Sequence, residues 1–110
     1  MPYDEILAHR LRELLADEDG LTEKRMFGGL AFLLHGNMAV SASGKGGLLV
    51  RIDPASTQEA IGHRHVDLMR MGGRTMDGWV TVAADGLKTK RDLGRWVKRG
   101  VTFARTLPPK

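Results

Sequence analysis

The sequence contains no cysteine, few aromatic residues and no long apolar run. Without a thiol, the chain can form no disulfide, build no thiolate metal site and use no cysteine nucleophile. The longest apolar run, Leu30–Leu34, is far shorter than the roughly 20 residues of a membrane-spanning helix. The acidic, soon amphipathic start of the chain is unlike a signal peptide. We therefore expect a soluble cytoplasmic protein that does not enter a membrane.

What the sequence does contain is typical of one globular domain. The chain has 110 residues, of which 42% are hydrophobic and 27% are charged, and these are ordinary values for a single domain. We expect residues 1–110 to form this domain, with residues 105–110 as a flexible tail. A chain of this size can build one core but has little room for a deep, enclosed active site.

Charge is distributed unevenly along the chain, although the net charge is only +4. Residues 1–20 hold six acids and two bases, whereas residues 87–110 hold eight bases and one acid. A basic end of this kind can attract nucleic acid. Alternatively, the acidic and basic ends can complement each other, within one chain or between two chains.

Three segments carry helix signals. In residues 3–18, apolar side chains recur at helical spacing. Asp53-Pro54 has the pattern of a helix start, an acidic cap followed by proline, and this short helix should end near Gly62. A last helix should begin near Thr89. Its apolar face is predicted to consist of Leu93, Trp96, Val97, Gly100, Val101 and Ala104.

The segments between these helices have the pattern of short strands. Leu30–Leu34, Met38–Ser41 and Leu48–Ile52 are joined by glycine-containing turns, which predicts an antiparallel meander. Before this meander, Thr22–Phe27 should form a first strand, which Gly28-Gly29 should break or bulge.

A second group of strands is expected near residue 80. A loop containing Gly72-Gly73 leads to Arg74–Met76, and Asp77-Gly78 is a strong hairpin signal before the strand Trp79–Val82. The predicted fold class is α+β, with the order α-β-β-β-α-β-β-α. We expect two layers, a five-stranded antiparallel sheet with the helices on one face.

This order of elements, with Lys24-Arg25-Met26-Phe27-Gly28-Gly29-Leu30 entering the sheet, resembles the N-terminal domain of the TfoX (Sxy) family of bacterial competence regulators. The likeness runs from about Tyr3 to Ala104. Its other elements are Asn37–Val40, Leu48–Asp53, Gly72-Gly73 before Met76, and Trp96 with the basic residues that follow it.

The resemblance implies a secretion-chaperone-like fold that commonly self-associates, and a regulatory role to which no enzymatic activity or cofactor is assigned. Full-length family members carry a second, helical C-terminal domain. This sequence ends at Lys110 without such a domain, so the resemblance implies a stand-alone relative.

Within the motif, Arg25 is the residue that we most expect to have a role beyond packing, as part of a binding surface. The adjacent glycines can permit close approach of a ligand, but shaping the strands is the simpler explanation. The turn Ser43–Gly47 contains Gly44-Lys45 but lacks the P-loop pattern, because glycine follows the lysine and a strand comes next. We expect a plain hairpin turn there.

Metal and catalytic sites have little support in the sequence. His63 and His65 can share one face of an extended segment, but no carboxylate spacing accompanies them, so we predict solvated histidines and no metal. No serine lies in a nucleophile elbow. The six methionines, especially Met69, Met71 and Met76, can line an adaptable interface or fill the core, and core filling is the simpler interpretation.

The outer face of the last helix is the most suggestive surface. It presents a cationic stripe of Arg91, Arg95, Lys98, Arg99 and Arg105, which can track phosphates or simply be solvated. We favour a non-catalytic regulatory or protein-interaction domain that binds a protein partner or forms a homodimer. The alternative is a nucleic-acid-binding module that uses this basic helix.

Overall fold

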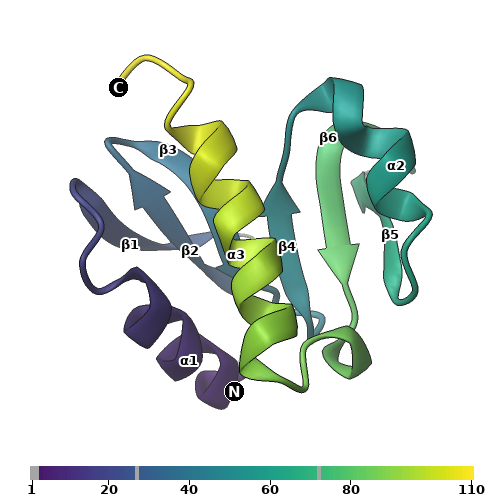
Figure 1. Cartoon of the computed structure of the whole chain (residues 1–110), viewed down its shortest axis with the longest axis horizontal. Helices are drawn as coiled ribbons and strands as arrows, with labels where there is room; N and C mark the ends of the chain where they lie inside the picture. Colours follow the sequence, from purple (N-terminus) through teal and green to yellow (C-terminus); the bar gives the residue numbers. More distant parts are fainter. Residues whose placement is uncertain (1–2, 27, 72) are drawn as a thin grey trace.

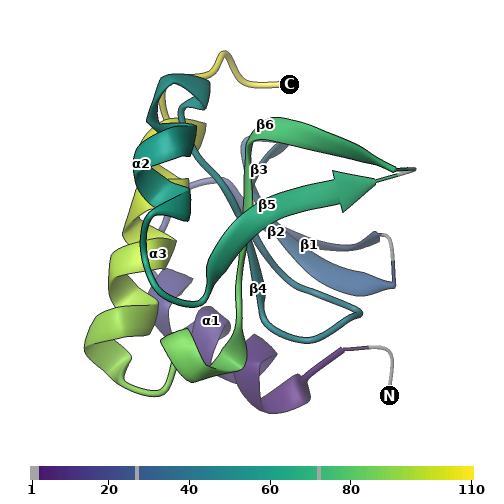
Figure 2. The same cartoon turned by 90° about the vertical axis from the view of Figure 1, so that its right-hand side faces the viewer.

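The computed structural model describes residues 3–26, 28–71 and 73–110, with three helices on one face of an antiparallel sheet (Figures 1 and 2). The helices are α1 (Glu5–Leu15), α2 (Thr57–Ile61) and α3 (Lys90–Ala104). The strands are β1 (Leu21–Met26), β2 (Gly29–Leu34), β3 (Asn37–Ala42), β4 (Leu48–Arg51), β5 (Val66–Met71) and β6 (Arg74–Val82), in the sheet order β1-β2-β3-β4-β6-β5. This confirms the predicted α+β, two-layer architecture.

Side chains that cap the first backbone amides determine where the helices begin. Asp4 accepts hydrogen bonds from the amides of Ile6 and Leu7 at the start of α1, and Thr89 accepts one from Asp92 at the start of α3. Asp53 caps a short 3-10 turn, Pro54–Ser56, that leads into α2. Each cap satisfies amides that have no partner inside the helix, and each is worth about 1 kcal/mol.

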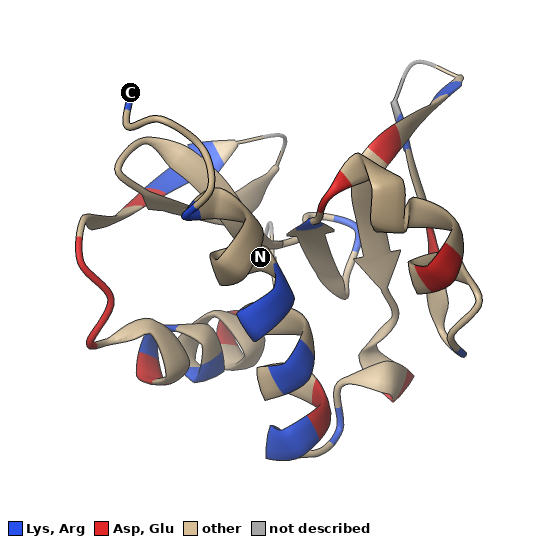
Figure 3. Cartoon of the chain, turned by 45° about the horizontal axis from the view of Figure 1, so that its top comes forward, with Lys and Arg blue, Asp and Glu red and all other residues tan. Residues whose placement is uncertain are grey.

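The principal core lies between the helices and the sheet. The predicted apolar face of α3 is confirmed, because Leu93, Trp96 and Val97 are buried and pack with the core. α1 contributes Leu7 and Leu11 from its own stripe. The outward faces of these helices are charged, with bases recurring along α3, both signs of charge on α1, and acids gathered on the α1–β1 connection (Figure 3).

The sheet has six strands rather than the five that the sequence predicted. The predicted first strand is confirmed as β1, which pairs with β2 from Leu21↔Leu34 to Met26↔Gly29. Phe27, the last residue of the predicted first strand, lies outside the described residues. The predicted loop before Gly72 contains β5, which pairs with β6 at the edge of the sheet. Gly72 itself also lies outside the described residues.

The prediction that Asp77-Gly78 forms a hairpin turn is wrong, because both residues lie inside the single strand β6. Gly78 has a positive φ of 84°, as the sequence pattern requires. The register against β5 shifts at this point, which is the signature of a bulge. The positive φ therefore bends one strand instead of joining two.

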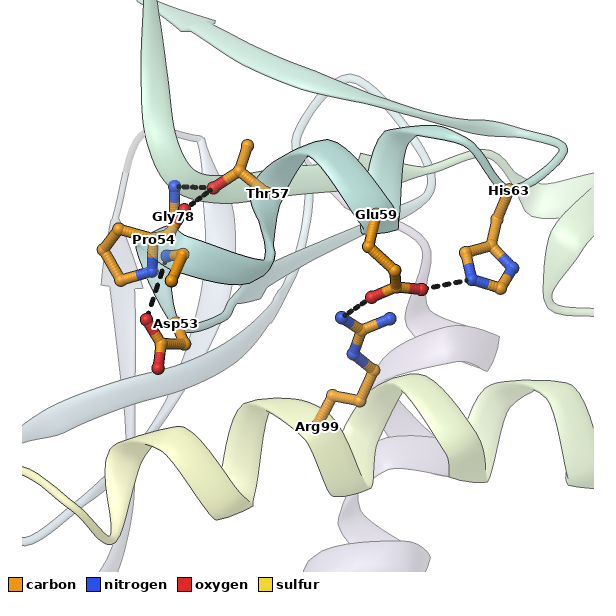
Figure 4. Close-up of polar contacts among 8 residues, drawn as sticks. Asp53, Pro54, Thr57, Glu59, His63, Gly78 and Arg99 are labelled. Atoms are coloured by element: carbon orange, nitrogen blue, oxygen red, sulfur yellow. Dashed lines mark hydrogen bonds and ion pairs between the residues drawn. The ribbon is translucent and has the colours of Figure 1, made fainter.

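The bulge is held by the first residue of α2 and by the segment that precedes this helix. The Gly78 amide donates to Thr57 Oγ1 at 2.8 Å, and the Thr57 hydroxyl donates to the Pro54 carbonyl at 2.7 Å (Figure 4). The Ile52 amide donates to the Gly78 carbonyl at 2.8 Å. These bonds connect the end of β4, the start of α2 and β6.

The segment predicted to be a flexible tail contacts the β2–β3 hairpin. Asn37 donates a side-chain hydrogen bond to the Pro108 carbonyl at 2.9 Å, and the Lys110 amide donates to the His35 carbonyl at 2.8 Å. Among the described residues, no helix combines the length and the apolarity that crossing a membrane requires.

Candidate functional site

The face of the sheet turned away from the three helices, here called the open face, carries a second apolar cluster. Ala31, Met38 and Leu49 are buried in it. Met26, Leu33, Met69 and Trp79 are half-buried around them. In Figure 2 the two ends of the sheet bend away from the helices on either side of this face.

Two adjoining hollows run across the open face. One has a volume of about 510 Å³ and is lined by Trp79, Met76 and Met38, among others. The other has a volume of about 420 Å³ and is lined by residues that include Ser41 and Thr81. Met26, Leu49 and Met69 line both hollows. The two hollows therefore form one continuous depression, here called the open-face groove.

Strand alternation and the bulge together bring these side chains onto one face. Successive residues of a strand point to opposite faces, so Thr81 and Trp79 of β6 face the groove while Val80 and Val82 enter the core. Met76 lies an odd number of positions before Trp79 and would point the other way in a regular strand. Between the pairs Leu68↔Val80 and Arg70↔Thr75, β6 has three residues more than a regular ladder allows, and this odd number turns Met76 into the groove.

Every methionine whose side chain the structure describes lies on this groove. Met26, Met38, Met69 and Met76 line it, and the principal core contains no methionine among the described residues. Met69 packs, half-buried, against the second apolar cluster, and Met76 lines the groove beside it. The side chain of Met71 lies outside what the structure describes.

Cations surround the apolar floor of the groove. The charged lining residues, here called the rim, are Lys24, Lys45, Arg51, Arg70 and Lys110, with Asp67 as the one carboxylate among the described lining residues. The Arg51 guanidinium lies 5.0 Å from the Trp79 ring centroid and 5.5 Å from that of Phe103. These cation–π contacts hold the guanidinium beside the indole at one end of the groove.

The cationic stripe predicted on α3 is interrupted by two intramolecular ion pairs. Arg99 pairs with Glu59 at 2.7 Å and Arg105 pairs with Glu18 at 2.8 Å. Arg91, Arg95 and Lys98 are exposed and form no ion pair with a described residue. Three of the five bases of the predicted stripe are therefore available. The Glu18–Arg105 pair also brings the acidic and basic ends of the sequence together within one chain.

Glu59 is the centre of a small polar cluster between α2 and α3. One carboxylate oxygen lies 2.7 Å from His63 Nε2, and the other accepts a hydrogen bond from Arg99 (Figure 4). Hydrogen bonds to His63 and then to Arg99 lower the pKa of Glu59 below its usual value. Arg99 also stacks on Trp96, at 4.9 Å from the ring centroid. Arg99 is thus engaged in contacts within the fold, whereas Arg91, Arg95 and Lys98 of the same helix are exposed.

The other candidates from the sequence lie apart from one another. Ser43–Gly47 forms the β3–β4 turn, closed by a bond from the Ser43 amide to the Gly47 carbonyl, as predicted. His63 bonds Glu59 and His65 lies on the connection before β5. Over residues 3–26, 28–71 and 73–110, no three histidine or acidic side chains gather as a metal site would require.

A family comparison agrees with the resemblance noted in the sequence. The TfoX N-terminal domain family matches residues 13–104, which is most of the chain. The chain belongs to the TfoX N-terminal domain family. A search of curated proteins found no match. Membership in this family supports a regulatory kind of role.

In this TfoX N-terminal domain, the glycines of the motif are structural. Gly28 has a positive φ of 77° beside the β1–β2 turn. A Cβ on Gly44, in the β3–β4 turn, would lie 2.6 Å from the Gly28 carbonyl oxygen, so the two turns pack backbone against backbone. Arg25 is exposed on β1 and pairs with Leu30, a core residue, so it lies on the opposite face of β1 from Lys24 and Met26. Arg25 therefore does not belong to the open-face groove.

Sequence reasoning missed the groove as a site. Its floor is assembled from β1 to β6, and Trp79 and Met26 are 53 positions apart in the chain. The one local signal was the number of methionines, which alone does not say on which face of a sheet they lie.

Proposed function

We propose that this chain is a non-catalytic regulatory domain that binds a protein partner in the open-face groove. The observation that carries the proposal is that all four described methionine side chains line the groove and none fills the principal core. Methionine is flexible and polarisable, so it adapts to a partner's shape, and it is over-used at binding surfaces of this kind.

The composition of the groove is that of an interface. Methionine, tryptophan and arginine are enriched in the centres of protein interfaces, whereas lysine is typical of the polar rim. Here Trp79 and Arg51 stack beside the methionines, and Lys24 and Lys45 lie at the edges. Because a stacked pair loses little freedom on binding, Trp79 with Arg51 is the expected energetic centre of the interface.

The biological setting follows the family. The resemblance implies a part in transcription regulation, including the control of competence. The sequence, which lacks a signal-peptide pattern and a long apolar run, favours a cytoplasmic location, and both are part of the proposal. Homodimerisation belongs to it as well, through a surface other than the groove.

The proposal is tested by asking whether binding depends on the floor of the groove. Random peptides displayed on phage are selected on the full chain, and the affinity of the enriched peptides is measured by fluorescence anisotropy. The floor variant is Met69→Gln/Met76→Gln, which keeps side-chain length but adds amides that lack partners in an apolar contact. We expect it to weaken binding about tenfold or more.

The matched control is Arg91→Gln/Lys98→Gln, two exposed positions on α3 on the other side of the molecule. It should leave the affinity within about twofold. Thermal unfolding followed by circular dichroism checks that both variants fold. Failure to enrich any peptide, or enriched peptides that bind the floor variant as well as the unaltered chain, would contradict the proposal.

Nucleic-acid binding through α3 stays a second candidate because Arg91, Arg95 and Lys98 are exposed and recur at helical spacing. A gel shift at low and moderate salt tests it with Arg95→Ala/Lys98→Ala. Arg99 is left unchanged because its loss would disturb the contacts with Glu59 and Trp96. A shift that weakens with salt and with these substitutions supports this candidate. No shift at low salt excludes it.

A further inference from the structure

We propose that the segment received by the open-face groove is an amphipathic α-helix whose apolar stripe is flanked by acidic side chains. This inference rests on the proposed function and adds the chemistry and the conformation of the partner. It follows from the backbone of the groove floor, from the sign of the charge around it, and from what a second copy of the chain would meet there.

The backbone of the floor favours a helix over an extended peptide. β2, β3, β4 and β6 each pair with a neighbour on both sides, so their amides and carbonyls are engaged within the sheet. An extended peptide lying on that floor would find few partners for its own backbone groups, and leaving them unpaired is costly. A helix satisfies its backbone internally and presents only side chains.

The dimensions suit a helix of moderate length. The molecule measures about 30 Å in each direction, with principal extents of 31, 30 and 29 Å. A helix of about 18 residues is about 27 Å long. Such a helix would place apolar side chains along both hollows of the groove, from the Trp79 end to the β3–β4 turn.

The positive charge of the rim favours a partner helix that carries acidic side chains beside its apolar ones. Lys24 stands on β1 and Arg70 on β5, the two edge strands of the sheet, so cations border the floor on both sides. Asp67 is the one described carboxylate of the lining, and it accepts a hydrogen bond from the Leu68 amide. A partner with carboxylates beside its apolar stripe is attracted to this rim, whereas a basic one is repelled.

The same charges disfavour a second copy of this chain in the groove. In a two-fold dimer the same surface patch meets itself, so two open faces would bring two cationic rims together. Like charges opposed across an interface cost several kcal/mol. The predicted homodimer would therefore use another surface.

The test uses three synthetic peptides of about 18 residues and the full chain. The acidic peptide has leucines at helical spacing with glutamates beside them, and the basic peptide has the same leucines with lysines instead. A scrambled peptide keeps the acidic composition but has no apolar stripe. Affinities are measured by fluorescence anisotropy at low and at moderate salt.

We expect the acidic peptide to bind at least about tenfold more tightly than the basic one, and the scrambled peptide to bind weakly. The difference should shrink as salt screens the rim. The rim variant Lys24→Glu/Arg70→Glu should lose the preference or reverse it. The charge-matched control Arg91→Glu/Lys98→Glu, on the far side of the molecule, should keep it.

The outcomes separate this inference from the function on which it rests. If the phage-selected peptides depend on Met69 and Met76 but carry no acidic excess, or if the basic peptide binds as well as the acidic one, the inference is overturned and the protein-binding function stands. If no peptide responds to the floor variant, the proposed function itself fails. A dimer seen by light scattering that dissociates in Met69→Gln/Met76→Gln would overturn the inference by making a second copy the occupant.

Discussion

Thr57 joins the start of α2 to strand β6, and it is a single residue whose removal has a predictable cost. Its hydroxyl accepts a hydrogen bond from the Gly78 amide and donates one to the Pro54 carbonyl. The residue is buried, with an exposed fraction of 2%. The Gly78 amide therefore has no water to replace a lost partner.

We expect Thr57→Val to lower the free energy of unfolding by about 1–3 kcal/mol, because it keeps the shape of the side chain but leaves a buried amide unpaired. Urea unfolding measures the difference. Thr57→Ser is the control, since it retains the hydroxyl. A valine variant as stable as the serine variant would show that the bond does not hold the bulge.

Two carboxylates make the stability of the fold dependent on pH. Hydrogen bonds to His63 and then Arg99 lower the pKa of Glu59, and a hydrogen bond to Arg12 lowers that of Glu23, both from the usual 4.5. A carboxyl whose pKa is lower in the folded state stabilises the fold above its unfolded pKa. That contribution is lost as the pH falls below about 4.5 through the folded pKa.

The expected result is a fall in the urea midpoint between pH 7 and pH 3 that is smaller in Glu23→Gln/Glu59→Gln than in the unaltered chain. Both groups are near the surface, so salt should reduce the effect. An equal fall in the two proteins would mean that these ion pairs contribute nothing to the pH dependence.

At the scale of elements, the position of α3 against the sheet depends on a close contact at Gly100. A Cβ added there would lie 2.5 Å from the Ala39 carbonyl oxygen of β3, whereas a Cβ on Gly94 of the same helix would meet no atom within 4 Å. Both glycines thus lie in helical backbone, but Gly100 packs closely against β3 whereas Gly94 faces open space.

Gly94→Ala should stabilise the fold by about 0.5–1 kcal/mol, because alanine is the better helix former and the space is open. Gly100→Ala gains the same propensity but forces α3 away from β3, and a net loss of about 1–3 kcal/mol is expected. Thermal unfolding of the two variants side by side measures both effects. Equal shifts of the same sign would contradict the close packing at Gly100.

Elements were predictable from sequence where the signal is local. The caps at Asp53 and Thr89 and the apolar face of α3 depend on residues within a few positions of one another, and they were predicted. β5 was missed because its strand character depends on pairing with residues such as Val82, 16 positions from Val66. At Asp77-Gly78 the need for a positive φ was predicted, but a bulge and a turn both meet that need.

At the scale of the whole molecule, the two faces of the sheet have different roles. The three helices cover one face and bury the principal core. The open face keeps an apolar groove with a cationic rim. The groove was not predictable from the sequence because strand order and bulges decide which methionines share a face.

NMR of the chain labelled at its methionine methyl groups shows whether a partner lies on the methionines of the open face. Met26, Met38, Met69 and Met76 place four reporters on the groove, and single Met→Leu variants assign their resonances. Saturation with the acidic amphipathic peptide should shift these four signals, and the basic peptide should leave them in place. Methyl signals that do not move while anisotropy reports a saturated complex would show that the partner does not lie in the open-face groove.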